Sequence, residues 1–334
     1  MASTAFIIGG TGQIGRATAR NLLAKGWRVR LAQRSDAGLP ADLAGRVDLV
    51  ELDRDQPGAL AAGLAGGADA VIDTVAFTEA HARQLIALSR DIGALVVISS
   101  ASVYRDGAGR TLDEAAQTGF PEFPVPIGED QPTVEAGPAT YSTAKVALEQ
   151  ALLQDFPRPV TILRPAAIYG DGSRHPREWW FVKRLLDGRR RIPLAYEGQS
   201  RFHTSATANI AELCRIALEQ PATRVLNAAD PRALTVAEIG AAIAAAYGVD
   251  LDFVRLSGPP KRGVGAHPWC IPEAIVLDMS RAEALGYRPV VRYEDAVGEA
   301  CRSVEAAAAA GVVFPAYINA LFDYTAEDAA LAKA

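Results

Sequence analysis

A short apolar run near the start of the chain, Phe6 to Ile8, breaks into three spaced glycines. The residues that follow, 16–25, have a helical composition. A strand, a glycine turn and a helix in this order are typical of a site that holds a dinucleotide phosphate at a helix N-terminus. An ordinary tight turn is the alternative, and the flanking strand and helix favour the dinucleotide. The residues expected at the cofactor here are Gly9, Thr11, Gly12, Gln13, Ile14 and Gly15.

Alternating strands and helices continue along the first half of the chain. Strands are expected at 27–32, 47–52, 70–76, 94–98 and 160–163, with helices at 56–64, 79–90 and 141–155. This alternation predicts the α/β class, with a doubly wound parallel Rossmann sheet and a ligand crevice at the carboxyl ends of its strands. A smaller, mostly C-terminal α/β region is expected to bind the substrate.

The composition changes after Gly170, which suggests a boundary. We expect residues 1–170 to form the dinucleotide-binding domain, with 204–230 returning to it, and residues 171–203 and 231–334 to form the substrate-binding region. Helices are expected there at 179–186, 209–219, 235–247 and 293–310, and a strand at 224–227. The tail after Phe314 is assigned no element.

A long segment rich in glycine, proline and acidic residues, 105–140, lies between two candidate catalytic stretches. Long loops without regular structure are usually functional or disordered. We therefore expect this segment to form a partial lid over the site.

Composition narrows the functional class. The 334 residues are 49% hydrophobic and 22% charged, as in soluble globular enzymes, and the net charge of −5 gives no footprint for nucleic acid. Three widely spaced cysteines suggest reduced thiols, no leader is visible, and no apolar run reaches the roughly 20 residues that span a bilayer. A cytoplasmic protein without a membrane partner is expected. His175, His267 and Cys270 lack metal-ligand spacing, so no metal is predicted.

The end of the second expected strand indicates which dinucleotide binds. An acidic side chain there would bind a ribose 2′-hydroxyl, whereas an arginine accommodates a 2′-phosphate. The strand closes on Gln33 and Arg34, while a count of about 20 residues from the glycines leads to Asp36, which lies past the strand. The strand end is the better guide, and it favours NADP(H) with NAD(H) as the alternative. Arg34 as a solvated surface charge is the competing interpretation.

The third strand closes on Asp53 and Arg54, and both are expected at the cofactor. At this position the Asp53 carboxylate would accept a hydrogen bond from the adenine amino group. An N-cap for the following helix is about equally well supported.

Tyr141 and Lys145 share one face of an expected helix, because they are four residues apart. The phenol of a free tyrosine has a pKa near 10, and a neighbouring ammonium lowers it. Such a tyrosine exchanges protons with an alcohol or carbonyl near neutral pH. The pair alone occurs often by chance, but its place after the glycine turn and five strands makes it a strong catalytic signal.

The chain resembles the extended branch of the short-chain dehydrogenase/reductase superfamily, which contains NAD(P)-dependent epimerases, dehydratases and reductases. The resembling stretches are 9–15, Asp53, 98–104, 141–145 and 163–170. The resemblance implies that Tyr141 is the catalytic acid/base, that Lys145 is its partner and holds the nicotinamide ribose, and that Ser100 orients the substrate oxygen. It also implies that Pro165 to Ile168 run beside the nicotinamide and that Val75 and Ala76 lie beside the phosphates and ribose. A homodimer through the helices at 79–90 and 141–155 is typical of the family.

Departures from the family pattern narrow the activity. The 4,6-dehydratases carry an Asp-Glu pair directly after the catalytic hydroxyl, and this chain has Ala101 and Ser102 there. The segment 77–84 lacks the Asn-x-x-Gly-Thr helix of sugar-nucleotide epimerases, and 105–140 is longer than theirs. The chain therefore looks more like reductase-like or atypical members of the family.

Candidates for substrate contact are weaker. They are Ser102, Tyr104, Trp179, Arg201 and His203. Arg201 as a phosphate ligand and Arg201 as a surface charge are about even, and structural roles are favoured for His203 and Trp179.

Together these features predict an NADP(H)-dependent oxidoreductase. It would move a hydride between the nicotinamide and a carbonyl or secondary alcohol of a small metabolite. The first alternative is a sugar-nucleotide type epimerase with a retained cofactor. The second alternative is a non-catalytic relative that senses the cofactor or binds RNA.

Overall fold

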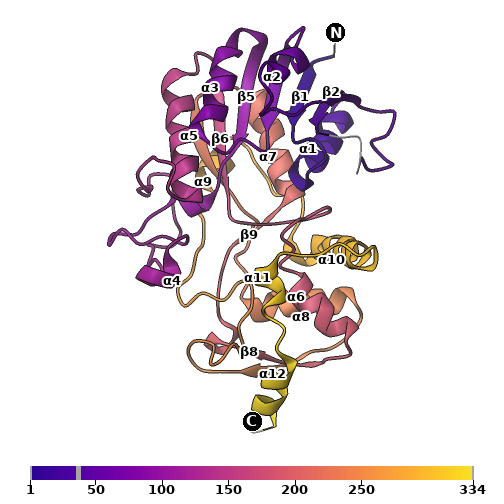
Figure 1. The fold of residues 1–334 in the computed structure, drawn as a ribbon, viewed down its shortest axis with the longest axis vertical. Coiled ribbons are helices and arrows are strands. Elements are labelled where there is room, and N and C mark those ends of the chain that lie inside the picture. Colours follow the sequence, from indigo (N-terminus) through magenta and orange to yellow (C-terminus); the bar gives the residue numbers. More distant parts are fainter. Residues whose placement is uncertain (1, 35–38, 333–334) are drawn as a thin grey trace.

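A computed structural model describes residues 2–34 and 39–332 (Figure 1). Its main element is a seven-stranded sheet in the order β10-β6-β5-β4-β1-β2-β3, in which every neighbouring pair is parallel. The strands are β1 (Thr4–Ile8), β2 (Arg28–Gln33), β3 (Asp48–Glu51), β4 (Ala68–Asp73), β5 (Ile92–Ile98), β6 (Val160–Pro165) and β10 (Arg224–Ala228). The predicted doubly wound α/β fold is confirmed.

Alternate residues of the strands face opposite layers of helices, as the pleat of a sheet requires. Ala5 and Ile7 belong to a core with α1 (Gln13–Ala24) and α7 (Thr207–Glu219). Phe6 and Ile8 belong to a second core with α2 (Ala59–Gly63), α3 (Glu79–Ala87) and α5 (Tyr141–Asp155). Both faces of the sheet are therefore covered, which explains why its strands read as continuous apolar runs.

The helix expected at 56–64 is shorter in the structure. It begins at Ala59, because Gly58 has a left-handed backbone with φ of 76° that a helix does not accept. Asp53 therefore does not cap this helix. Its carboxylate instead accepts a hydrogen bond from the backbone N–H of Asp55 at 3.2 Å.

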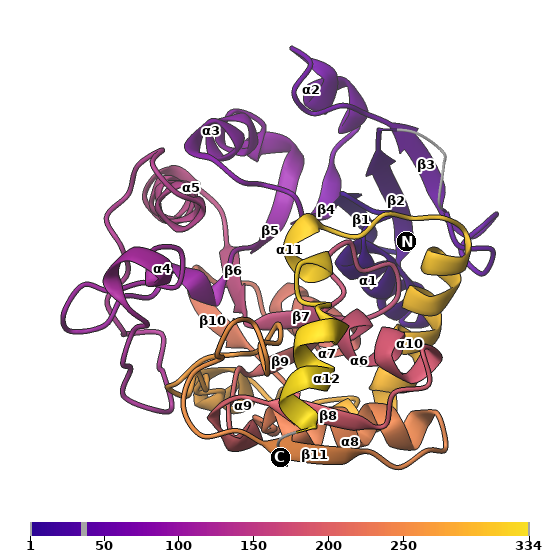
Figure 2. The same ribbon diagram turned by 60° about the horizontal axis from the view of Figure 1, so that its bottom comes forward.

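The second half of the chain builds a separate core around α6 (Trp179–Leu186), whose Trp180 and Phe181 are fully buried. Figure 1 shows these elements below the sheet. The other helices of this region are α8 (Val236–Ala246), α10 (Tyr293–Ala309), α11 (Ala316–Asn319) and α12 (Tyr324–Leu331), whereas α9 (Ser280–Ala284) packs on the core of the sheet. Two small parallel sheets were not predicted: β7 (Ala167–Tyr169) with β9 (Thr204–Ala206), and β8 (Arg191–Leu194) with β11 (Asp252–Arg255), the latter pair seen at the lower edge of Figure 2.

The segment 105–140 is anchored outside the crevice. It contains the short helix α4 (Ala115–Thr118) and follows a 3-10 turn, η2 (Ala101–Val103). Asp113 accepts a hydrogen bond from the N–H of Ser142 at 2.8 Å, and Ile127 donates to the carbonyl of Val276 at 2.7 Å. No residue of 105–140 lines the cavity at the strand ends, so the expected partial lid is not seen in this structure.

The remaining short elements are the 3-10 turns η1 (Ser89–Asp91) and η3 (Tyr196–Gly198). Within the part of the chain that is described, no helix is both long and apolar enough to cross a bilayer.

Candidate active site

A cavity of about 640 Å³ opens at the carboxyl ends of β1, β2, β4 and β5. Twelve of the sequence-predicted site residues line it: Gly9, Thr11, Gly12, Gln13, Ile14, Arg34, Asp53, Arg54, Val75, Tyr141, Lys145 and Ile168. Strand ends of a parallel sheet meet at one edge, so residues far apart in the sequence converge here. Gly15, Ala76, Ser100 and Pro165 lie outside the lining.

The glycine turn fits a phosphate group. Gly9 has φ of 80°, and a Cβ there would lie 2.5 Å from Thr74 Oγ1. A Cβ on Gly15 would lie 2.5 Å from the Gly9 carbonyl oxygen, so only glycine lets α1 pack this closely. The N-cap of α1, Gly12, adds no side-chain cap, and the first turn holds no acidic residue. The positive end of this helix is therefore available to an anion.

The end of β2 reaches the same cavity. Gln33 is buried and Arg34 is exposed, and both line it. Asp36, which the residue count singled out, lies outside the described residues. The described end of β2 therefore presents a cation and no carboxylate to the cavity.

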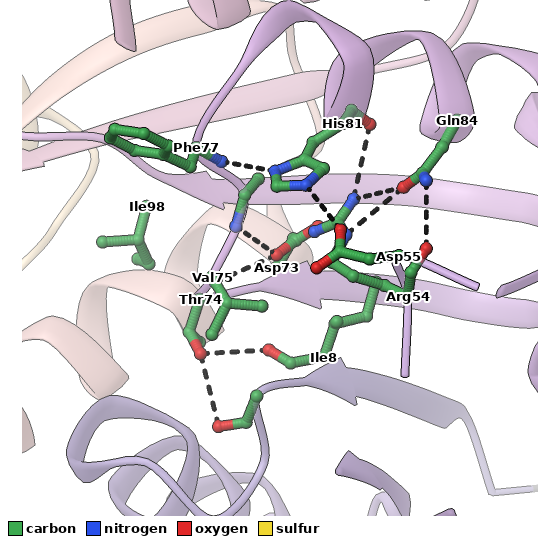
Figure 3. A network of polar contacts seen from close by, with 12 residues as sticks. Ile8, Arg54, Asp55, Asp73, Thr74, Val75, Phe77, His81, Gln84 and Ile98 are labelled. Atoms are coloured by element: carbon green, nitrogen blue, oxygen red, sulfur yellow. Dashed lines mark hydrogen bonds and ion pairs between the residues drawn. The ribbon is translucent and has the colours of Figure 1, made fainter. Parts of the chain in front are cut away.

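Arg54 lines the cavity, but its guanidinium is engaged elsewhere (Figure 3). It forms a buried ion pair with Asp73 at 2.5 Å, and it donates to Gln84 Oε1 at 3.0 and 3.3 Å. Asp53, one residue earlier, is half-buried and lines the cavity.

Lys145 is buried on α5, and its ammonium donates hydrogen bonds to the turn after β4 and to the end of β5. Its Nζ donates to the carbonyls of Ala76 at 2.6 Å and Ile98 at 2.9 Å. Burial lowers the pKa of this lysine to about 8, while the carboxylates of Asp73 and Glu149 oppose that shift. The amine therefore titrates close to physiological pH.

Tyr141 opens α5, where Thr140 and Thr143 form a reciprocal capping box. The Tyr141 ring lies 5.4 Å from the Phe77 ring, and Lys145 Nζ lies 5.7 Å from the centre of the tyrosine ring. Tyr141 is 44% exposed, so the desolvation that raises its pKa acts on a partly solvated phenol, and the Ser100 hydroxyl opposes the rise. The shift is therefore upward in this structure, and the expected lowering of this pKa by Lys145 is not found.

Two serines stand beside this pair. Ser100 caps η2, and its Oγ accepts a hydrogen bond from the Ser102 N–H at 3.1 Å. Ser142 Oγ donates to Ser102 Oγ at 2.9 Å. The Ser100 hydroxyl also acts to lower the pKa of Tyr141, and Lys145 Nζ lies 5.7 Å from the Tyr141 ring, so the three predicted catalytic side chains lie close together.

The other predicted substrate residues do not line the cavity. The buried Tyr104 donates its hydroxyl to Asn227 Oδ1 at 2.7 Å. The buried His203 bonds the Asp230 carbonyl at 2.8 Å and accepts from the Leu277 N–H at 3.1 Å. Trp179 packs on Phe314, and Arg201 donates to the Ala233 carbonyl at 2.6 Å. These side chains are used to hold the fold in this structure.

Several lining residues were missed by the sequence interpretation. Thr74 and His81 follow β4, while Gly172, Arg174 and His175 come from the segment after β7. Their sequence carries no motif for this position. Only the fold, which brings the segment after Gly170 back over the strand ends, places them at the cavity.

Comparison with known proteins agrees with this architecture. The model of the NAD dependent epimerase/dehydratase family matches residues 5–229. Among solved structures, the Bordetella bronchiseptica enzyme WbmH in complex with NAD+ has 20% identity and a TM-score of 0.69, covering 91% of this chain and 99% of that chain. UDP-glucose 4-epimerase of Thermus thermophilus, in complex with NAD, has 18% identity and a TM-score of 0.67, with coverage of 91% and 99%.

A third similar structure is the UDP-N-acetylglucosamine 4-epimerase from Bacillus cereus, with 18% identity, a TM-score of 0.66 and coverage of 90% and 99%. No curated protein matches the chain. At these identities the solved structures establish the fold, and the family model establishes the family. The chain belongs to the NAD-dependent epimerase/dehydratase family, whose members are enzymes of the short-chain dehydrogenase/reductase type.

Proposed function

We propose that this protein is an NADP(H)-dependent oxidoreductase acting on a carbonyl or secondary alcohol of a small metabolite. The observation that carries the proposal is the convergence of Ser100, Tyr141 and Lys145 at the strand ends, with Lys145 held by the Ala76 and Ile98 carbonyls. The glycine turn and the uncapped start of α1 fit the cofactor's phosphates.

The residues divide the chemistry between them. When bound, the nicotinamide supplies or accepts the hydride. Tyr141 gives a proton to the substrate oxygen in reduction and takes it back in oxidation, while Ser100 hydrogen-bonds that oxygen. Lys145 contributes a positive charge, since with a pKa of about 8 it is mostly protonated at pH 7. The Pro165 to Ile168 segment would lie beside the nicotinamide, and Ile168 lines the cavity.

Replacement of Tyr141 by phenylalanine tests the mechanism. A screen of small carbonyl compounds, with NADPH oxidation followed by its near-ultraviolet absorbance, first identifies a substrate. Loss of the phenol removes the acid/base, so turnover of that substrate should fall by about 100-fold or more. NADPH affinity should stay within about threefold, and unchanged turnover would refute the mechanism.

The cofactor preference is tested at Arg34. Its exposed cation at the end of β2 supports a 2′-phosphate. Fluorescence titration should show tighter binding of NADPH than of NADH. Arg34→Ala should weaken NADPH binding by about 10-fold, as expected for the loss of one charge-assisted contact, and leave NADH unchanged. Tighter binding of NADH by the wild-type protein would contradict the preference.

A second candidate is a sugar-nucleotide epimerase, which the similar structures titled UDP-sugar 4-epimerases favour. Such an enzyme oxidises and reduces the same substrate, so its dinucleotide stays bound. Mass spectrometry of denatured protein after extensive dialysis distinguishes the two candidates. A stoichiometric dinucleotide supports the epimerase, and its absence with turnover of added NADPH supports the oxidoreductase.

We also propose a homodimer through α3 and α5, which light scattering tests.

A further inference from the structure

The turn that follows β4 is held by a buried carboxylate (Figure 3). Asp73 is fully buried, and its Oδ1 accepts hydrogen bonds from the N–H groups of Val75 at 3.0 Å and Ala76 at 2.7 Å. Its second oxygen, Oδ2, faces Arg54 at 2.5 Å. An ionised side chain with no access to water requires such a complete set of partners. Asp73 therefore holds the backbone of the turn through one oxygen, and Arg54 compensates its charge at the other.

Arg54 is in turn fastened to α3. Its Nε and Nη2 donate to Gln84 Oε1, and Gln84 Nε2 donates back to the Arg54 carbonyl at 3.0 Å. Nη2 also reaches the His81 carbonyl at 3.4 Å. Because all these partners belong to the protein, the guanidinium is oriented toward Asp73 and α3, and a dinucleotide is not needed to hold it.

The held turn carries the acceptor for the catalytic lysine. Ala76, whose N–H is bonded by Asp73, offers its carbonyl to Lys145 Nζ at 2.6 Å. The chain of contacts thus runs from Arg54 through Asp73 and the Ala76 peptide to the ammonium. The charged groups that act on Lys145 are Asp73, Glu149 and Arg54, and the Tyr141 ring lies beside it.

The same turn reaches Tyr141 through its last residue. The N–H of Phe77 donates to His81 Nδ1 at 2.9 Å, and His81 Nε2 lies 3.2 Å from Asp55 Oδ1. Since Nδ1 accepts, Nε2 carries the proton in this tautomer and donates to the carboxylate. This bond holds the backbone of Phe77, whose ring lies 5.4 Å from the ring of Tyr141. Two neighbouring residues of one loop, Arg54 and Asp55, therefore support both ends of the turn.

We propose that Arg54 is a positioning residue that acts through Asp73 and the turn 75–77 to set the place and charge of the Lys145 ammonium. This inference depends on the proposed function only in that Lys145 is taken to serve catalysis. It differs from the expectation that Arg54 binds the cofactor directly. If Arg54 is a positioning residue, its loss should change the titration of Lys145 and leave NADPH affinity almost unchanged. If Arg54 binds the cofactor directly, its loss should lower NADPH affinity and leave Lys145 unchanged.

Competitive labelling of lysines tests the proposal without a substrate. The full-length protein is treated with trace acetic anhydride across the neutral to alkaline range, and mass spectrometry compares Lys145 with Lys25 on each sample. Arg54→Met removes a positive charge, while the N–H groups of Val75 and Ala76 still favour the ionised form of Asp73 in the alkaline range, so the labelling midpoint of Lys145 should move up by about one pH unit. NADPH affinity, from fluorescence titration, should stay within about threefold. Asp73→Asn should move the midpoint down, because a negative charge is lost.

A matched control is Arg30→Met. Arg30 lies on β2, donates to the Gly63 carbonyl at 2.6 Å and stacks over the Phe6 ring, away from the turn, so its removal should leave the Lys145 midpoint unchanged. An unchanged midpoint in folded Arg54→Met, or a loss of NADPH affinity of about tenfold or more without a shift, would overturn the proposal. Because labelling needs no turnover, a failure of the proposed function would appear instead as full activity of Tyr141→Phe.

Discussion

Two buried arginines perform different tasks in the two halves of the molecule. Arg54 is 7% exposed and its partner Asp73 is fully buried, and the pair stands at the edge of the cavity. Arg184 on α6 is fully buried against Glu327 of α12, and its guanidinium lies 3.7 Å from the centre of the Trp180 ring. The first pair shapes a turn beside the candidate active site, whereas the second fastens the end of the chain.

The two pairs differ in how far apart their partners lie along the chain, and this explains their different tasks. Arg54 is joined to residues at most 30 positions away, and Asp73 passes its charge on to backbone N–H groups at the turn. Arg184 is joined to a residue 143 positions away, and its other donors reach the carbonyls of Trp180 and Leu321. A buried ion pair is costly in itself, so each is retained for what it orders. Loss of one partner of either pair should reduce stability, and only loss of the first should also change the reactivity of Lys145.

The largest expected effect on stability is that of Glu327→Ala. This change leaves the Arg184 guanidinium buried without its carboxylate, so the free energy of unfolding should fall by about 3–5 kcal/mol. Urea unfolding measures the loss, and NADPH affinity at low temperature should stay within about twofold. The double variant Arg184→Met/Glu327→Leu should recover most of the stability, since it removes both charges. A single variant as stable as the wild type would show that the tail is not held by this pair.

A smaller and pH-dependent effect is expected at Glu178, which is buried beside α6. Burial raises its pKa to about 7, while the positive charge of Arg177 opposes the rise. The folded state therefore prefers the neutral acid, and stability is lost as the pH rises from the unfolded value near 4.5 through 7. Glu178→Gln should raise the thermal midpoint at about pH 8 by a few degrees, and the gain should shrink toward about pH 5. A pH-independent change would contradict the titration.

The smallest effect is expected where an arginine pairs on the surface. Arg83 is exposed and bridges Glu79 of α3 and Asp155 of α5. Solvent and salt screen such pairs, so Arg83→Ala should leave the unfolding midpoint within experimental error at about 150 mM salt. A clear loss of stability would show that this exposed pair contributes to stability as the two buried pairs do.

The sheet was predictable from the sequence because its signals are local. The run Phe6 to Ile8, the glycines after it and the spacing of Tyr141 and Lys145 each lie within a few residues, and the structure places them as strand, turn and helix face. The cavity at the strand ends follows from parallel topology alone. Most of the predicted cofactor residues line it for that reason.

The features that were missed depend on distant partners. β8 and β11 are four residues each and pair across about 60 positions, so neither has a pattern of its own. α12 buries a charged residue, Glu327, at a core position, which removes the apolar face that marks a helix. The role of Arg54 depends on Asp73, and no spacing rule connects a residue after β3 with one at the end of β4.

The hydrogen bonds of Lys145 limit what its ammonium offers to a ligand. An ammonium has three N–H donors, and two of them are given to the Ala76 and Ile98 carbonyls. One donor therefore serves every other acceptor, whether a ribose hydroxyl or the phenolate of Tyr141. These acceptors compete for a single N–H donor, so a hydrogen bond to the ribose hydroxyl excludes a hydrogen bond to the Tyr141 oxygen. Arginine has five donors in one plane and cannot reproduce this arrangement of hydrogen bonds, so Lys145→Arg is not a conservative exchange.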